Sequence, residues 1–419
     1  MALRHDNVLG LKCVLCGAEY GMDEVTYVCP HHGNEGILDV VYDYPRIAGR
    51  LSKKSLARDR NFSIWRYLPL LPVADRAAIP PLQVGWTPLY PAERLRTQLG
   101  LSDLWIKDDG RNPTASFKDR ASAVGVARAR ELSRPIMTAA STGNAASSLA
   151  GIAASVGMTT YIFVPETAPQ AKIAQLLIFG ANVIMVRGTY DHAFDLCLEA
   201  SAEYGWYSRN TAFNPYLSEG KKTASLEICE QLGWEAPDRI FVSVGDGCII
   251  GGLWKGLRDL FALGFIDRMP KLMGIQAEGS AVLAKAWKSG TEEIEPIVPT
   301  TLADSISVGI PRDRIKALRA VRETGGEYIA VSDDEILDAM RILARGAAVF
   351  GEPAGVTGFA GLRKALREGR VRPDEKIVVL VTGNGLKDVA SAMKATGKPH
   401  LIDPTLPDLR GLMRTLGKV

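Results

Sequence analysis

Short apolar runs alternate with longer helical segments along most of the chain. The apolar runs, each of a length suited to one buried strand, are residues 104–107, 135–139, 160–164, 182–186, 239–244, 271–275 and 376–381. Helical periodicity is clearest over residues 144–155, 170–179 and 191–204. Strands that are apolar throughout and separated by helices are typical of parallel sheets covered on both faces. The pattern therefore predicts an α/β protein whose ligands bind in the loops at the carboxyl ends of its strands.

The composition is that of an ordinary globular protein. Hydrophobic residues make up 47% of the 419 positions, charged residues make up 23%, and the net charge is +3. No basic run of the kind that follows nucleic acid is present, no apolar stretch reaches the length of a membrane span, and the N-terminus lacks a signal-peptide core. We therefore expect a cytoplasmic protein with two domains and an appendage, and with neither nucleic acid nor membrane as a partner.

Cysteines cluster near the N-terminus in a pattern typical of a zinc ribbon. Cys13 and Cys16 form one pair, and Cys29 with His32 forms a second pair with the same two-residue gap. Three thiolates and one imidazole would give a closed tetrahedral site with a structural role. His31 is the competing ligand, and the equal gap favours His32. A hairpin of reduced cysteines without metal is the alternative.

One lysine stands where turn-forming residues lead into a helix. Residues 112–116, Asn-Pro-Thr-Ala-Ser, precede Phe117 and Lys118. Ser116 and Asp119 fit the Ser-x-x-acid capping pattern, which predicts a helix that begins at Ser116 and holds Lys118 in its first turn. The positive end of a helix dipole favours the neutral amine, which a lysine needs to form a Schiff base with a carbonyl cofactor. Taken alone, a surface lysine on an amphipathic helix is the commoner explanation.

Three small-residue loops follow predicted strands and could converge with this lysine. Residues 141–145, Ser-Thr-Gly-Asn-Ala, offer backbone N–H groups to a carboxylate and the amide of Asn144. Residues 245–252 form a glycine-rich strand-to-helix turn that suits a phosphate group. This turn lacks the Gly-Lys-[Ser/Thr] of nucleoside triphosphate loops. Residues 382–388, Thr-Gly-Asn-Gly-Leu-Lys-Asp, follow the last apolar strand.

Four motifs, in their order along the chain, resemble those of threonine synthase, a fold-type II pyridoxal-phosphate enzyme of the tryptophan-synthase-β type. The motifs are Asn-Pro-Thr-x-Ser-Phe-Lys-Asp-Arg, Ser-Thr-Gly-Asn, the glycine-rich loop and Thr-Gly-Asn-Gly-Leu-Lys-Asp. The resemblance covers about residues 80–390, and the cysteine-rich piece also resembles that of many threonine synthases. It implies a homodimer and two three-layer αβα domains. The implied parts are a zinc-ribbon-like segment (1–45), a large cofactor-binding domain (46–114 and 236–400), a small mobile domain (115–235) and a C-terminal tail (401–419).

The resemblance also implies roles for individual residues. Lys118 would carry the cofactor and remove the α-proton, Asn144 would bond the ring 3′-oxygen, and Thr382 would face the pyridine nitrogen. The implied cofactor-phosphate loop is Gly245, Asp246, Gly247, Cys248 and Ile249. The implied substrate-binding residues are Ser141, Thr142, Asn144, Ala145 and Asn210. The implied reaction is β- or γ-elimination or replacement on an amino acid such as O-phosphohomoserine.

Four positions depart from the threonine synthase pattern. Ala145 and Leu217 stand where the family usually has a threonine and an arginine, and Asp246 and Ser307 stand where an asparagine and another arginine are usual. Because charge-assisted bonds to phosphate contribute about 1.5–3 kcal/mol each, these changes would weaken binding of a phosphorylated substrate.

Several functions therefore stay open. One is a threonine synthase with a rearranged phosphate site, and another is a paralogue that acts on a non-phosphorylated or cationic amino acid, with Asp246 pairing to the cation. A threonine or serine ammonia-lyase is a closer variant. From another class, a zinc-ribbon scaffold without catalysis is disfavoured because Lys118 and the phosphate loop are both present.

Overall fold

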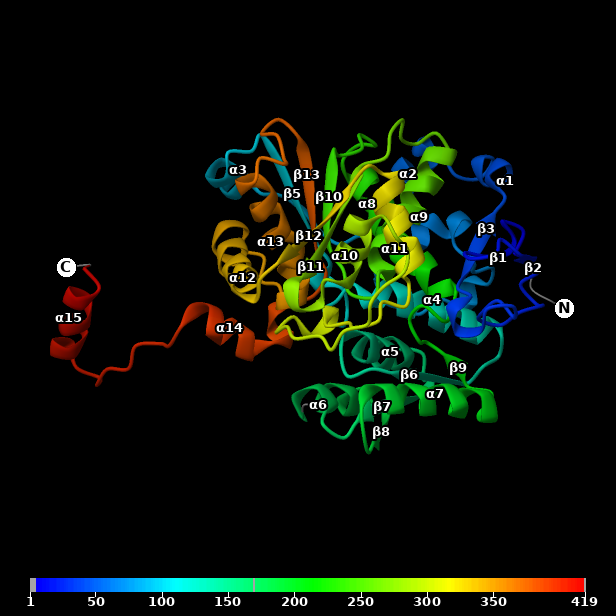
Figure 1. The fold of residues 1–419 in the computed structure, drawn as a ribbon, viewed down its shortest axis with the longest axis horizontal. Helices are drawn as coiled ribbons and strands as arrows, with labels where there is room; N and C mark the ends of the chain where they lie inside the picture. Colours follow the sequence, from blue (N-terminus) through cyan, green and yellow to red (C-terminus); the bar gives the residue numbers. More distant parts are fainter. Residues whose placement is uncertain (1–4, 169, 418–419) are drawn as a thin grey trace.

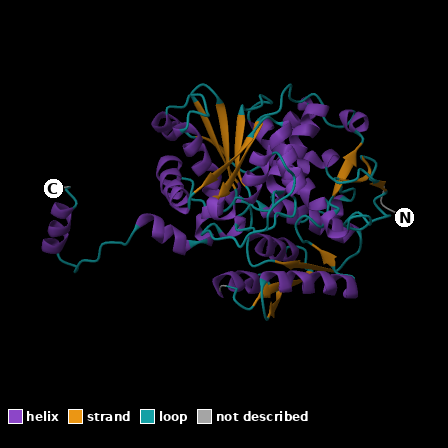
Figure 2. Cartoon of the chain, viewed as in Figure 1, coloured by secondary structure: helices purple, strands orange, loops and turns teal. Residues whose placement is uncertain are grey.

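The computed structural model describes residues 5–168 and 170–417, and two separate sheets organise them. The larger sheet has six strands (Figures 1 and 2). In spatial order they are β12 (Glu327–Val331), β11 (Lys271–Ala277), β10 (Arg239–Ser243), β13 (Lys376–Val381), β5 (Asp103–Asp108) and β4 (Leu89–Pro91). All neighbours are parallel except β4, which pairs antiparallel with β5 at the edge.

Both faces of the larger sheet are covered by helices because its strands are apolar on both sides. Ile240 and Val242 of β10 point into one core, and Phe241 between them points into the other. On the first face lie α9 (Cys248–Ala262), α10 (Val282–Ser289) and α11 (Arg314–Glu323). On the second face lie α3 (Glu93–Leu99), α12 (Asp333–Ala347) and α13 (Pro353–Arg367).

The smaller sheet has four parallel strands and the same three-layer construction. Their order is β8 (Asn182–Val186), β7 (Thr159–Pro165), β6 (Ile136–Ala140) and β9 (Tyr207–Ser208). Ile162 and Val164 pack with α5 (Asn144–Ala154) and α6 (Gln170–Ile178), whereas Phe163 packs with α7 (Tyr190–Tyr204) on the other face. The two αβα units agree with the predicted fold class.

Two buried helices, α4 (Lys118–Glu131) and α8 (Tyr216–Gln231), pack against each other, and α8 also packs against α9. A side chain at Gly220 would lie 2.0 Å from the carbonyl oxygen of Arg120, so glycine is required where α8 crosses α4. Both helices are buried almost all round, and they carry charged residues into the core. The predicted domain boundary at residue 235 therefore falls just after a helix that packs tightly against α9 of the larger unit.

The N-terminal segment is a small antiparallel sheet of β1 (Val8–Cys13), β2 (Glu19–Tyr20) and β3 (Leu38–Tyr42). Its buried apolar side chains join the core of the larger unit. Polar contacts add to this packing: Asp39 accepts from Lys316 at 2.9 Å, and the Tyr42 hydroxyl donates to Glu219 at 2.7 Å. The Tyr27 hydroxyl accepts from the backbone N–H of Ser208 at 2.8 Å. The segment therefore touches both the large core and the end of the smaller sheet.

The remaining helices lie at the periphery. They are α1 (Tyr44–Ala48), α2 (Lys53–Arg58), α14 (Val389–Thr396) and α15 (Leu406–Thr415), together with short 3₁₀ helices such as η6 (Asp304–Ile306). Helix α15 lies well away from the rest of the molecule, at the end of an extended arm (Figure 1). Among the helices of residues 5–168 and 170–417, none combines the length and the apolar character that crossing a membrane would need.

The structure corrects one detail of the predicted capping pattern. Helix α4 begins at Lys118, and its N-cap residue, Phe117, offers no side-chain cap. Ser116 instead forms a β-bridge with Gly383, and its buried hydroxyl has no partner among the described residues. The carboxylate of Asp119 turns back to accept from the N–H of Thr114 at 2.6 Å and from its hydroxyl. Lys118 still stands in the first turn, as expected.

Candidate active site

Backbone hydrogen bonds join the turn that precedes Lys118 to the loop that follows β13. The N–H of Phe117 donates to the carbonyl oxygen of Thr382 at 2.9 Å, and the N–H of Asn384 donates to that of Ala115 at 3.0 Å. Ala115 has a φ of +62°, a left-handed conformation that is uncommon outside glycine. The motifs around Lys118 and Thr382 therefore form one continuous structure at the carboxyl edge of the larger sheet.

The surroundings of Lys118 favour its neutral amine. Burial, together with the positive charges of Lys221 and Arg209, lowers the pKa of Lys118 to about 8. Lys221 comes from α8, and Arg209 directly follows β9. The sequence predicted a lowered pKa for Lys118 at the start of a helix, and the structure buries this lysine and places two cations near it. A lysine in this state can react with a carbonyl group near neutral pH.

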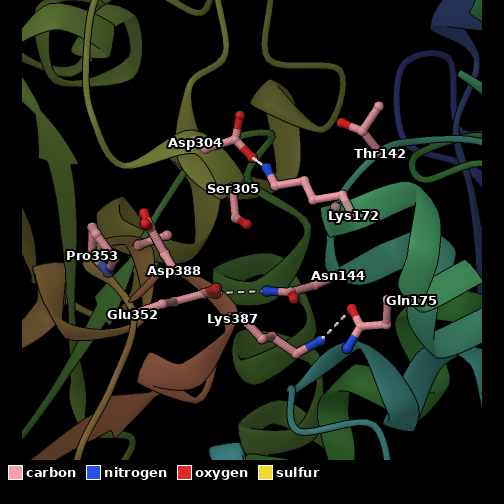
Figure 3. Close-up of a pocket in the computed structure, with 12 residues that line it drawn as sticks. Thr142, Asn144, Lys172, Gln175, Asp304, Ser305, Glu352, Pro353, Lys387 and Asp388 are labelled. Atoms are coloured by element: carbon pink, nitrogen blue, oxygen red, sulfur yellow. Dashed lines mark hydrogen bonds and ion pairs between the residues drawn. The ribbon is translucent and has the colours of Figure 1, made fainter. Parts of the chain in front are cut away.

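Asn144, the first residue of α5, bonds a carboxylate across the gap between the two sheets. Its amide nitrogen donates to Glu352 at 2.6 Å (Figure 3). Glu352 is the N-cap residue of α13 in the larger unit, its side chain forms no capping hydrogen bond, and burial raises its pKa. These residues line a small cleft with a volume of about 40 Å³. Its other walls are Thr142, Gly143, Lys172, Gln175, Asp304, Ser305, Pro353, Ala354, Lys387 and Asp388.

Polar contacts cross the mouth of this cleft. Lys172 of α6 pairs with Asp304 of η6, and Lys387 lies 3.3 Å from the side-chain oxygen of Gln175 (Figure 3). Each contact joins the smaller unit to the larger one. The cleft is therefore framed by charged and amide side chains from both units, which suits a small polar ligand.

The glycine-rich loop leads into α9 and leaves the start of that helix without a side-chain cap. Gly247 is the N-cap residue with a φ of +91°, and a side chain there would lie 2.5 Å from Cβ of Ala317. Helix N-termini present N–H groups and a positive dipole end to anions. Cys248, the first residue of α9, is buried, and burial raises the pKa of its thiol. The loop can thus hold a phosphate through its backbone.

The predicted substrate residues of the Ser-Thr-Gly-Asn loop are brought to the cleft. Thr142 and Asn144 line it, and the Ser141 hydroxyl accepts from the N–H of Gly143 at 3.1 Å, which fixes the turn. Ala145 follows in the first turn of α5 and is partly buried.

Asn210 uses its side chain within the protein. Its amide oxygen accepts from the N–H of Ala140 at 2.9 Å, and its amide nitrogen lies 3.5 Å from the Cys197 sulfur. Both ends of the amide therefore hold the loop that follows β9 against β6 and α7.

The departures from the family pattern have structural settings of their own. Leu217 is buried and points toward Gly125 of α4. Asp246 turns toward the segment before α11, where its carboxylate oxygen accepts from the N–H of Arg312 at 3.4 Å. Ser307 is partly buried just after η6. None of these three side chains lines the cleft described above.

Glu352 and Arg209 of this site were missed from the sequence, and Lys221 could not be placed there from the sequence. Lys221 lies on a helix that is buried on nearly every side, so no periodicity distinguishes the face toward Lys118. Glu352 follows Gly351 and precedes Pro353 at a helix start, a pattern that indicates a cap as readily as a ligand.

The N-terminal cysteines come together as the spacing predicts. The sulfur atoms of Cys13, Cys16 and Cys29 all lie within 4.8 Å of one another. His32 does not belong to this group and is exposed, whereas the Tyr20 hydroxyl lies 3.1 Å from the Cys29 sulfur. Three thiols at such distances suit a soft, tetrahedral metal ion such as zinc.

The chain is similar to known proteins over most of its length. The profile of the family described as "Pyridoxal-phosphate dependent enzyme" matches residues 81–383. The threonine synthase of Methanocaldococcus jannaschii is 40% identical over 407 residues, which cover 97% of this chain and 99% of that protein. The threonine synthase of Methanosarcina acetivorans is 40% identical over 96% of this chain and 97% of its own length.

This chain belongs to the threonine synthase family. It is a pyridoxal-phosphate-dependent lyase of the threonine synthase type, as the motifs predicted. Solved structures support the fold. Threonine deaminase isoform 2 from Solanum lycopersicum matches with a TM-score of 0.63 and 24% identity, over 74% of this chain and 87% of that one. Diaminopropionate ammonia lyase from Escherichia coli matches with a TM-score of 0.65 and 17% identity, over 80% and 93%.

Proposed function

We propose that this enzyme converts O-phosphohomoserine and one water molecule into threonine and inorganic phosphate. The observation that carries the proposal is the position of Lys118, which has a pKa of about 8 and lies where the loops of both sheets meet. The similarity to threonine synthases over nearly the whole chain supports the choice of product.

The residues of the site fit pyridoxal phosphate, which when bound acts as an electron sink for the α-carbon of an amino acid. We assign the cofactor phosphate to the loop from Gly245 to Ile249, where the start of α9 has no side-chain cap. The amide of Asn144 is held by Glu352 and has a second N–H for the ring 3′-oxygen. Thr382 would offer a neutral hydroxyl to the ring nitrogen.

Lys118 would supply the acid–base chemistry. Its neutral amine accepts the α-proton and later returns a proton to a neighbouring carbon. When the substrate amine takes the place of Lys118 on the cofactor carbonyl carbon, the Lys118 amine would be released to act as this base. We assign the substrate carboxylate to the loop of Ser141, Thr142 and Asn144, which lies at the start of α5. The cleft between the two units would exclude bulk water while this chemistry proceeds.

Two measurements test this function. The loaded enzyme should show a visible absorbance band that Lys118→Ala lacks, and O-phosphohomoserine should give equal amounts of threonine and phosphate. Homoserine, threonine, serine and basic amino acids serve as comparison substrates. Keto-acid and ammonia from threonine or serine, without threonine formation, would establish the ammonia-lyase instead. Turnover of a basic amino acid that Asp246→Asn abolishes would establish the cationic alternative.

We also propose that the cysteine group binds a structural zinc ion. Cys13, Cys16 and Cys29 supply three thiolates, and the sequence offers His32 as the fourth ligand. Zinc content of about one ion per chain should fall in Cys13→Ser. In His32→Ala, loss of zinc would establish the histidine ligand, whereas retention would direct attention to Tyr20, whose hydroxyl lies 3.1 Å from Cys29. No zinc in the parent protein would refute the site.

We further propose a cytoplasmic homodimer. All six cysteines are free, which suits a reducing compartment. Leu401 and Leu406 on the C-terminal arm are 98% and 57% exposed, which suits burial against a second copy. Light scattering on the full chain would measure the mass, and cell fractionation would measure the location. A monomeric mass at micromolar concentration would contradict the dimer.

A further inference from the structure

Nearly all buried basic side chains in the described residues are paired with acids. Among the lysines, Lys107 pairs with Glu227, Lys222 with Glu219 and Asp259, Lys255 with Glu219, and Lys316 with Asp39, at 2.6–3.1 Å. Among the arginines, Arg66, Arg120, Arg128 and Arg239 each pair with a glutamate or aspartate. Pairing of this kind is what allows a charge to be buried.

Lys221 and Arg209 are the two exceptions within residues 5–168 and 170–417. Each is 1% exposed, and neither forms an ion pair. The Lys221 ammonium has no hydrogen-bond partner, and one terminal nitrogen of Arg209 has none. The other nitrogens of Arg209 donate only to the hydroxyls of Ser122 and Thr211, at 3.2 and 3.1 Å. Both groups therefore keep unused donors in a buried place.

The two exceptions lie in the same place, beside Lys118 and the start of α9. Both charges act on Lys118 and on each other. A side chain at Gly252 in α9 would lie 2.7 Å from Cβ of Lys221, so this lysine packs directly on the first turns of α9. Asp313, whose charge also acts on Lys221, forms its ion pair with Lys316 at 3.8 Å.

We propose that Lys221 and Arg209, beside the first turns of α9, form a binding site for a phosphate monoester. Two buried cations match the charge of a phosphate dianion, and charged donors to phosphate form the stronger class of hydrogen bond. This site supplies cations in a chain that has Leu217 and Ser307 where its family usually has arginine. The phosphate comes either from the cofactor or from the substrate, and the assignment to the substrate rests on the proposed function.

Thermal unfolding of the protein without cofactor tests whether the unpaired ammonium of Lys221 lowers the stability of the fold. Lys221→Met keeps the length of the side chain and removes the polar group, so we expect a higher unfolding midpoint in phosphate-free buffer. Lys222→Met is the matched control, since Lys222 is the next residue on α8, is equally buried and is paired with acids. Its midpoint should fall. A fall in both variants would show that Lys221 has an ordinary structural role and would overturn the proposal.

Ligand binding then identifies the source of the phosphate. In one arm, inorganic phosphate is titrated into the loaded enzyme at constant ionic strength. In the other arm, the unloaded protein is titrated with pyridoxal phosphate and with pyridoxal, which lacks the phosphate. Lys221→Met and Arg209→Gln should weaken one of these phosphate-dependent affinities at least about tenfold, because each removes a charged donor.

Each pattern of results has one meaning. Loss of inorganic phosphate binding with unchanged cofactor binding assigns the site to the substrate phosphate. If the variants bind pyridoxal phosphate no more tightly than pyridoxal, the site is assigned to the cofactor phosphate. Unchanged affinities in both arms would overturn the proposal, even if threonine were formed. Neither arm needs turnover, so a failure of the proposed substrate would leave the binding result intact.

Discussion

Lys118 lies among charges that act on its amine from several elements. Arg209 and Lys221 lower its pKa, and Glu352 and Cys248 act in the opposite direction, with burial as the largest effect. The neutral fraction of the amine therefore rises as the pH rises toward about 8 and is nearly complete well above it. An exposed lysine would reach that state only above about pH 10.

The rate at which unloaded protein reacts with pyridoxal phosphate should follow this titration. Stopped-flow absorbance should show a rise of about tenfold per pH unit below the inflection and a plateau above about pH 8. Arg209→Gln removes a positive charge near Lys118, so the inflection should move to higher pH. A rate that keeps rising beyond about pH 10 in the parent protein would contradict the lowered pKa.

The turn before α4 gives a second prediction at this scale. Asp119 accepts two hydrogen bonds from Thr114, whereas the buried hydroxyl of Ser116 has no partner among the described residues. Asp119→Asn should therefore lower the free energy of unfolding by about 1–3 kcal/mol, and Ser116→Ala should change it by less than about 0.5 kcal/mol. Denaturant unfolding measures both. A larger loss of stability in Ser116→Ala than in Asp119→Asn would favour the Ser-x-x-acid cap that the sequence predicted.

Among the helices, α12 ends in an unfavourable conformation. Its C-cap residue, Ala348, is exposed and has a φ of +54°. Left-handed backbone costs an alanine about 1–2 kcal/mol, and glycine loses part of that gain through its larger freedom in the unfolded chain. Ala348→Gly should thus raise the free energy of unfolding by about 0.5–1 kcal/mol.

Gly290 provides the control for this prediction. It ends α10 with a φ of +73°, and a Cβ added there would meet no heavy atom within 4 Å among the described residues. Gly290→Ala should lower the free energy of unfolding by a similar amount. Stabilisation by both substitutions, measured in the same denaturant series, would show that backbone conformation does not decide the effect.

Most strands of both sheets were predictable because a strand buried on two faces is apolar throughout. Residues 182–186 and 376–381 match β8 and β13 at both ends. Strand β12 was missed although residues 328–331 are apolar, and β9 has only two residues. The convergence of the loops was also predictable, because the carboxyl ends of parallel strands lie at the same edge of a sheet. The side chains of α8 that reach the site could not be predicted, because a fully buried helix has no polar face that marks one side of it.

At the scale of the whole molecule, the N-terminal segment supports the site from outside. Tyr27 accepts a hydrogen bond from the N–H of Ser208, and its ring lies 4.7 Å from that of Phe213. Arg209 lies between these two contacts in the chain. On the other side, Asp39 pairs with Lys316, which in turn lies 3.8 Å from Asp313. Order in the cysteine-bearing segment is thereby linked to the positions of the buried cations.

Removal of the proposed zinc ion should consequently weaken cofactor binding at a distance. If the cysteine group holds zinc as proposed, chelation would loosen this segment, and the contact of Tyr27 with Ser208 would be lost with it. Loss of one buried hydrogen bond contributes about 1 kcal/mol, so the dissociation constant of pyridoxal phosphate should rise about fivefold, measured by absorbance titration. Tyr27→Phe isolates the contact, because it removes the hydroxyl and leaves the cysteines intact. If chelation leaves the affinity unchanged but Tyr27→Phe weakens it, the segment stays ordered without metal. If neither change alters the affinity, the cofactor site holds its geometry without the N-terminal segment.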